Sequence, residues 1–224
     1  MRTAITGLVS LAAAAEQTLL LEDGSTGGTS DDWAAVPLVA HCVDFKDQQS
    51  ERLSCLLTGT VPPQFGEVDH RSDSLYSSLS AKPAGEVLAA SRRVTTALVD
   101  ALWAVADDDL TDPSRHGWLN GRMLWLQIVV RGFWHPMGHL GDYYLNHGQA
   151  ERAVAMQSHA LATARYLAIP APAEGMAAYN LACALARSGL VEPARSALSD
   201  AISLNADLAV NAGRDPDLAA VRGQ

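Results

Sequence analysis

The chain has 224 residues, of which 48% are hydrophobic and 18% charged, and its formal net charge is −9. This length suffices for one large or two small domains with a buried core. The acidic balance, without a cluster of Lys and Arg, excludes the electrostatic surface typical of nucleic-acid-binding proteins and of helices that bind anionic membranes. We therefore expect neither a nucleic-acid nor a membrane partner.

The composition also favours helices over strands. Alanine is abundant and aromatic residues make up only 6% of the chain, and alanine has the highest helix propensity whereas aromatic residues favour strands. The three cysteines, Cys42, Cys55 and Cys183, share no metal-ligand spacing, which is typical of reduced thiols in a cytoplasmic protein. We predict an all-α, cytoplasmic protein.

Residues 3–21 have the apolar spacing of a first helix, with Leu8, Leu11 and Leu19 on one face. The first 15 residues also resemble a short signal peptide. The apolar pattern continues past any cleavage point, which favours a helix of the folded protein. We see no apolar run that reaches the roughly 20 residues needed to span a membrane.

Two further helices are predicted over residues 32–57 and 83–106 from their apolar spacing. The glycine- and serine-rich stretch 23–30 is typical of a connector. Consecutive prolines within residues 59–73 predict a loop, because proline cannot continue a helix. The acidic run 107–109 is interpreted as a solvated turn.

A long helix is predicted over residues 121–146, and it carries His135 and His139 four residues apart. On a helix this spacing places both imidazoles on one face, one turn apart, which is the geometry that a divalent metal needs. Such a pair also arises by chance in alanine-rich helices, so the spacing alone leaves a metal site and a structural pair open. Pro136 is expected to kink the helix at the pair. A third histidine, His41, lies in the apolar stripe of an earlier predicted helix.

The C-terminal third contains a repeat with a spacing of 41 residues. The first copy has Gly141, Tyr144, Gly148, Ala153 and Ala160, which recur as Ala182, Leu185, Gly189, Ala194 and Ala201. Both copies resemble the helix pairs of tetratricopeptide repeats, and residues 215–218 resemble the start of their terminal capping helix. Because the first copy begins inside the helix 121–146, the repeat helices are predicted to stack on the bundle formed by the preceding helices.

Two segments carry a resemblance to a known family. They are Trp33 followed by Val36-Pro37-Leu38-Val39-Ala40-His41, and Phe133-Trp134-His135-Pro136-Met137-Gly138-His139-Leu140. Together they resemble the DinB-like superfamily, with the ClbS/DfsB-like branch the nearest. The resemblance implies an up-and-down four-helix bundle over residues 1–148. The repeat predicts tetratricopeptide-like helical hairpins over residues 149–224, which lie outside the minimal family fold.

The resemblance also implies a divalent metal ion, most often zinc or nickel, held by His41, His135 and His139. Three neutral imidazoles leave a coordination position open for water or substrate, as in catalytic zinc sites. Asp44 and Asp142 could each accept a hydrogen bond from the second ring nitrogen of a ligand histidine, or could simply be surface acids.

Two further residues lie one turn from the histidine pair. Arg131 precedes His135 and Tyr143 follows His139, and either could steady an anionic or polar substrate. Packing against the core or exposure to solvent is an equal alternative for both.

Members of the superfamily include transferases of low-molecular-weight thiols and hydrolases that open reactive rings for self-resistance. The resemblance therefore predicts a metal-dependent transferase or hydrolase that acts on a small electrophilic molecule. Because no cysteine of the chain lies where it could serve as the nucleophile, any thiolate would arrive as a cosubstrate. The alternatives are a protein that sequesters a hydrophobic metabolite and a repeat-mediated interaction protein, including a homodimer.

Overall fold

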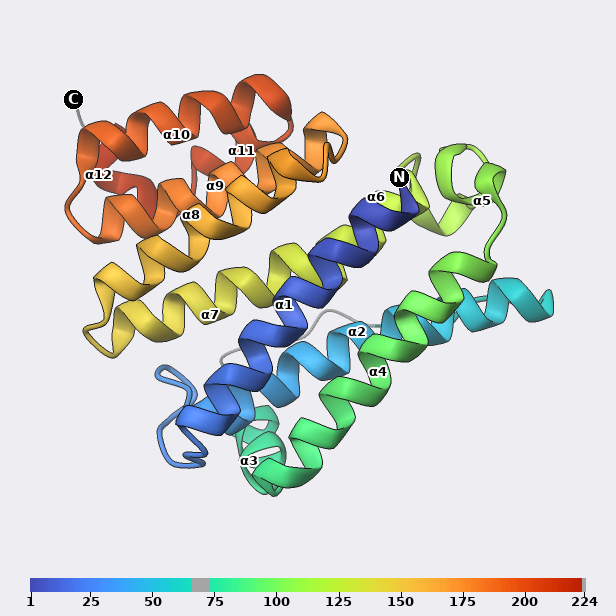
Figure 1. The fold of residues 1–224 in the computed structure, drawn as a ribbon, viewed down its shortest axis with the longest axis horizontal. Helices are drawn as coiled ribbons and strands as arrows, with labels where there is room; N and C mark the ends of the chain where they lie inside the picture. The colour runs from blue at the N-terminus through green and yellow to red at the C-terminus, as the bar shows by residue number, and fades with distance from the viewer. Residues whose placement is uncertain (66–72, 223–224) are drawn as a thin grey trace. The chain divides into compact units, whose positions relative to one another are not determined.

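The computed structural model describes residues 1–65 and 73–222, and over these ranges the chain is helical with no named strand. One isolated β-bridge joins Gly28 and Trp33. The all-α prediction is confirmed. The helices are α1 (Arg2–Glu22), α2 (Ala35–Thr58), α3 (Asp73–Ser80), α4 (Ala84–Ala104), α5 (Asp107–Thr111), η1 (Gly117–Leu119), α6 (Leu124–Val129), η2 (Val130–Trp134), α7 (His135–Asn146), α8 (Ala150–Tyr166), α9 (Ala171–Arg187), α10 (Val191–Leu204), α11 (Leu208–Ala212), η3 (Pro216–Leu218) and α12 (Ala219–Arg222) (Figure 1).

The chain forms two compact units whose division falls inside α7. One comprises residues 4–136 with Arg2, and the other comprises residues 137–224 with Met1 and Thr3. The predicted domain boundary at residue 148 is a different division, and it stays a prediction. Residues 66–72 of the loop predicted over residues 59–73 lie outside the described residues.

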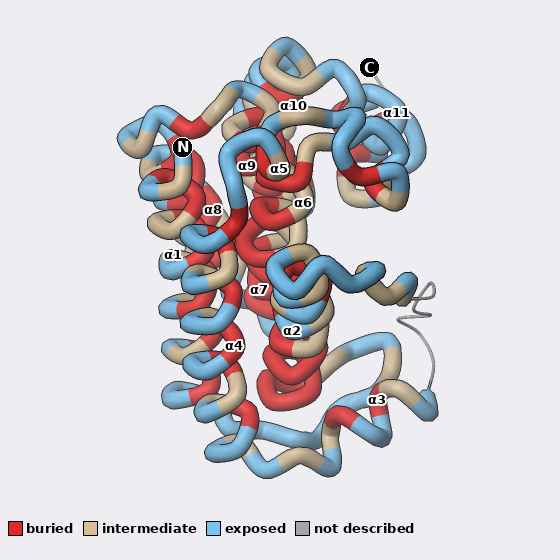
Figure 2. Tube along the Cα trace, turned by 90° about the vertical axis from the view of Figure 1, so that its right-hand side faces the viewer, coloured by how far each residue is buried: buried red, intermediate tan, exposed pale blue. Residues whose placement is uncertain are grey.

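In the first unit, α1, α2 and α4 lie side by side with the helix formed by α6 and η2. Buried apolar residues face inward from each of these helices, as the red stripes in Figure 2 show; they include Leu8, Val9, Leu53, Leu98, Ile128 and Phe133. Gly132 of η2 sets how closely the helices approach, because a Cβ there would meet Val9 Cγ2 of α1 at 2.8 Å and Leu98 Cδ2 of α4 at 3.2 Å. Only glycine fits this position without displacing either neighbour.

A buried ion pair crosses the core of this unit. Lys46 Nζ of α2 lies 2.5 Å from Glu16 Oε2 of α1, and both side chains are fully buried. Ser91 Oγ of α4 donates to the same oxygen at 2.9 Å. Three helices are therefore joined through one carboxylate, which the apolar spacing of the sequence did not predict.

The helix predicted over residues 121–146 is present from Leu124 to Asn146, but its middle turn is wider than an α-helix. Residues Val130–Trp134 form a π-helical turn, which closes with a bond from the His135 amide to the Val130 carbonyl. Pro136 explains the turn: proline has no N–H to donate, and its ring clashes with the carbonyl four residues earlier. A π turn accommodates one extra residue in the helix. The distortion that Pro136 was expected to cause is therefore present as a π turn.

Two short helices differ from the sequence predictions. Residues Asp107–Thr111 form α5, where a solvated turn was expected, and three aspartates occupy its first turn, where the helix dipole favours negative charge. Residues Asp73–Ser80 form α3, which was not predicted. Both are too short for apolar spacing to reveal.

The second unit contains two helical hairpins, α7–α8 and α9–α10. Gly148 and Gly189 adopt left-handed conformations, with φ of +70° and +78°, at the two equivalent turns. The small repeat positions are fully buried, namely Ala153, Ala160, Ala182, Ala194 and Ala201. Small residues at these positions let the paired helices approach closely. The terminal helix predicted from residue 215 is present as η3 and α12.

The sequence analysis expected no segment long and apolar enough to span a membrane, but the N-terminal helix α1 meets both criteria. By length and composition it is apolar enough to cross a membrane, with a mean hydropathy of 1.5 over 18 residues. Half of that stretch is buried inside the protein. Core helices and signal sequences have the same composition, so the finding distinguishes none of these roles.

Candidate metal centre

The first residue of the candidate site, His41 of α2, is held by two aromatic neighbours. Its side chain is only 2% exposed. The Trp33 ring meets the His41 ring edge-on with centroids 5.3 Å apart, and the Phe45 ring lies 4.7 Å from it. Because Phe45 is one turn along the same helix, the local helical geometry itself restricts the imidazole.

His135 lies opposite His41, at the first residue of α7. Its Nε2 lies 3.1 Å from Nε2 of His41. The Phe45 ring stacks on the His135 ring at 4.2 Å and 17°, so one phenyl ring contacts both imidazoles. The π turn ends at His135, and it therefore fixes which side of the helix the imidazole leaves.

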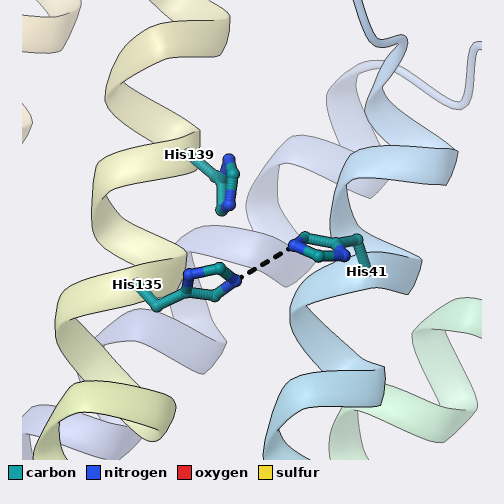
Figure 3. A group of neighbouring side chains, drawn as sticks. All are labelled: His41, His135 and His139. Atoms are coloured by element: carbon teal, nitrogen blue, oxygen red, sulfur yellow. Dashed lines mark hydrogen bonds between the residues drawn. The ribbon is translucent and has the colours of Figure 1, made fainter. Parts of the chain in front are cut away.

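His139 follows His135 by one turn of the continuous helix α7. The possible ligand atoms of His41, His135 and His139 all lie within 4.8 Å of one another. In Figure 3 the two α7 imidazoles project towards the ring from α2. The structure thus brings together the three histidines that the sequence singled out.

The donor set fits a divalent metal. With Zn–N bonds of about 2.0–2.1 Å, two nitrogens of a tetrahedral site lie roughly 3.3 Å apart, close to the 3.1 Å between His41 and His135. Two facing Nε2 atoms also cannot both carry a proton, so this contact needs one donor and one acceptor. With both nitrogens deprotonated, both lone pairs point into the space between the rings.

Arg131, one of the two residues predicted to steady a substrate, lies on η2 beside the site. Its guanidinium lies 4.6 Å from the centroid of Phe45 and donates to Gln48 Oε1 at 3.0 Å. Burial and the nearby charge of Arg52 lower the pKa of Arg131 to about 10. It contacts the aromatic residue that supports the imidazoles.

Tyr143, the other predicted substrate residue, is 4% exposed. Its ring stacks on His147 at 4.1 Å and meets Tyr144 edge-on. These contacts describe a packed residue of α7, and a substrate role for Tyr143 stays a prediction.

The two aspartates proposed as partners of the ligand histidines form ion pairs with other residues. Asp44 Oδ1 lies 3.2 Å from Lys82 Nζ, and Asp142 Oδ1 lies 2.7 Å from Arg187 Nη1. Burial, together with the nearby charge of Asp217, raises the pKa of Asp142 to about 6. Both acids therefore have a structural partner that the sequence did not indicate.

Sequence reasoning placed Gln48 on the same side of its helix as His41, but it singled out neither Phe45 nor Arg52 as part of the site. Phe45, Gln48 and Arg52 follow His41 by four, seven and eleven residues, which places them on the same face of α2. That periodicity is visible in the sequence. Their partners on η2 and α7 are not, because they are 79 or more residues distant in the chain.

A second group of possible ligands lies in the unit of residues 137–224. The side chains of Cys183, Asp215 and Asp217 also have ligand atoms within 4.8 Å of one another. Here burial and the neighbouring aspartates raise the pKa of the Cys183 thiol, and Arg187 Nη1 lies 3.7 Å from Asp217. A protonated thiol beside an arginine–aspartate cluster is typical of structural packing, because the thiolate is the metal-binding form.

No protein-family model, no curated protein and no solved structure matches this chain.

Proposed function

We propose that the protein is a metal-dependent DinB-like enzyme that acts on a small electrophilic molecule, by transfer of a low-molecular-weight thiol or by hydrolysis. One observation carries the proposal: imidazoles from α2 and α7, distant in sequence, have ligand atoms within 4.8 Å of one another. Three histidine ligands leave one position open in a tetrahedral site, the arrangement of catalytic zinc.

The bound metal would lower the pKa of a thiol or water and so supply a nucleophile near neutral pH. His41, His135 and His139 would hold it, and Phe45 would keep two of these rings in place. The chain's own buried thiols are poor nucleophiles, because burial raises the pKa of Cys42 and of Cys183. This supports a thiol that arrives as a cosubstrate.

The same proposal extends to the finer description of the fold. We propose that α1, α2, α4 and the helix of α6, η2 and α7 correspond to the DinB-like four-helix bundle. The hairpins α7–α8 and α9–α10 would correspond to two tetratricopeptide-like units. The buried small residues and the paired turn glycines, Gly148 and Gly189, support this correspondence.

Metal analysis tests the proposal directly. Purified full-length protein should bind one equivalent of zinc or nickel, and His41→Ala, His135→Ala and His139→Ala should each reduce that stoichiometry. His159→Ala, an exposed histidine of α8, is the matched control and should bind normally. Wild-type binding that is unchanged in all three variants would reject the metal centre.

Turnover then separates catalysis from sequestration. The metal-loaded protein is incubated with an electrophilic probe such as monobromobimane and with a thiol such as cysteine. An enzyme converts many equivalents of probe, whereas a sequestering protein stops at one. Loss of turnover in His135→Ala would assign the reaction to the metal centre.

A further inference from the structure

Beyond the histidines, the same face of α2 leads to two arginines that the metal chemistry does not use. Arg52 of α2 is 9% exposed, although it carries a full charge. Its guanidinium lies 5.4 Å from the ring of Trp118 and 4.9 Å from that of Phe65. Arg131 of η2 is close enough for the charge of Arg52 to lower its pKa.

Within residues 1–65 and 73–222, neither guanidinium forms a salt bridge with a carboxylate. Arg52 Nε donates to the Pro63 carbonyl at 3.3 Å, and Arg131 donates to the Gln48 side-chain amide. Both hydrogen-bond acceptors are neutral, and the adjacent Glu51 offsets the charge of Arg52 only in part, since the pKa of Arg52 remains lowered by burial. Bringing like charges together in a partly buried place costs free energy unless an anion joins them.

The indole of Trp118 adds an independent observation. Its Nε1 is buried and has no hydrogen-bond partner among the described residues. Buried N–H groups are nearly always paired, so this indole N–H is a donor available to an acceptor such as an oxyanion. The Arg52 guanidinium lies over this same ring, so the unpaired indole donor and the arginine are neighbours.

We propose that Arg52, Arg131 and Trp118 form an anion subsite that binds an oxyanion group of the substrate, a carboxylate or a phosphate. This inference rests on the proposed function, because it takes the histidines to be the reaction centre. Phe45 connects the two places: His135 stacks on its ring at 4.2 Å, and the Arg131 guanidinium lies 4.6 Å from the same ring centroid. The substrate class is then a small anionic electrophile, with its charged group held beside Phe45.

An anion titration on full-length protein tests the subsite without relying on the metal. The protein is stripped with 1,10-phenanthroline, an uncharged chelator, and dialysed into Tris chloride. Sodium phosphate and sodium acetate are then titrated calorimetrically at constant ionic strength. We expect saturable binding of at least one of them, and the tighter one identifies the oxyanion.

Three variants identify the residues. Arg131→Gln and Arg52→Gln should each weaken binding about tenfold or more, because a charge-assisted hydrogen bond is lost. Arg131→Lys keeps the charge but not the bidentate geometry and should bind with intermediate affinity. Arg93→Gln, an exposed arginine of α4, should bind as the wild type does. Circular dichroism confirms that each variant is folded, and Arg131→Lys keeps the test informative if Arg52→Gln unfolds.

Each result has one meaning. Absence of saturable binding of either anion, or equal weakening in Arg93→Gln, would overturn the subsite. Because the titration uses metal-free protein, it can fail while the metal stoichiometry holds. Conversely, anion binding that requires Arg52 and Arg131 in a protein that binds no metal would support the subsite and reject only the reaction centre.

Discussion

At the scale of single residues, Phe45 is the side chain on which the geometry of the candidate site depends. Its ring contacts His41 and His135 and lies beneath the Arg131 guanidinium. A metal ligand that can turn freely loses entropy on binding, so residues that orient ligands typically change metal affinity by 10- to 100-fold. The imidazoles of this protein are oriented by an aromatic ring.

We therefore expect Phe45→Leu to weaken zinc binding by roughly tenfold while leaving the fold intact. Competition against a chromophoric chelator measures the affinity. Trp103→Leu, which removes an exposed aromatic residue of α4, is the control and should leave the affinity unchanged. Equal affinities in Phe45→Leu and the wild type would show that the ring only fills space.

The buried ion pair gives a prediction about stability. Lys46→Met leaves the Glu16 carboxylate buried without its partner and should lower the free energy of unfolding by about 3–5 kcal/mol. Urea denaturation measures it. Lys82→Met breaks the more exposed pair with Asp44 and should cost less than about 1 kcal/mol. A similar small loss in both variants would contradict the importance of burial.

Single residues also show what the sequence could reveal. The spacing of His135 and His139 places both imidazoles on one face of a helix, and the position of His41 in the apolar stripe of an earlier helix marked it as a third candidate. Glu16 and Lys46 could not be paired, because the pairing depends on how two helices rotate against each other. Charged residues within apolar stripes are the sequence signal of such a pair, but the stripe alone names no partner.

At the scale of secondary structure, the long helices were predictable and the π turn was not. Residues 2–22, 35–58 and 84–104 carry enough apolar repeats to define a helical face. Pro136 indicated a distortion of the following helix. That the distortion is a π turn over Val130–Trp134 was not predicted.

Helix packing at Gly132 leads to a matched pair of substitutions. Gly132→Ala should destabilise the protein by about 1–3 kcal/mol, because the new methyl group overlaps Val9 and Leu98. Gly85→Ala in the first turn of α4 meets no atom within 4 Å and should stabilise by about 0.4–1 kcal/mol. Urea unfolding of both variants measures the two changes. Stabilisation by both would mean that α1, α4 and η2 pack less closely than the structure shows.

At the scale of the whole molecule, pH should change the stability of the unit of residues 137–224, which contains Asp142. The pKa of Asp142 is raised to about 6 in the folded unit of residues 137–224 and lies near 3.8 when unfolded. Between these values the folded state binds more protons than the unfolded state. The stability that Asp142 contributes is therefore present below about pH 4 and is lost as the pH rises to about 6.

Asp142→Asn should reduce the fall in stability between pH 4 and pH 6, because the amide does not titrate. Thermal unfolding at several pH values, followed through a probe in the second unit, measures the slope. Asp44→Asn replaces an aspartate of the other unit and is the control. Identical slopes for the wild type and Asp142→Asn would contradict the raised pKa.

Metal binding connects the candidate site to the stability of the molecule. A ligand that binds only the folded state stabilises it by RT ln(1 + [L]/Kd), about 2.7 kcal/mol at one hundred times Kd. His41 and His135 belong to the unit of residues 4–136, so zinc should raise the unfolding temperature of that unit. A chelator should reverse the increase, and His135→Ala should abolish it while His159→Ala retains it. Differential scanning calorimetry with and without zinc measures the shift, and a shift of equal size in His135→Ala would mean that zinc stabilises the protein from another place.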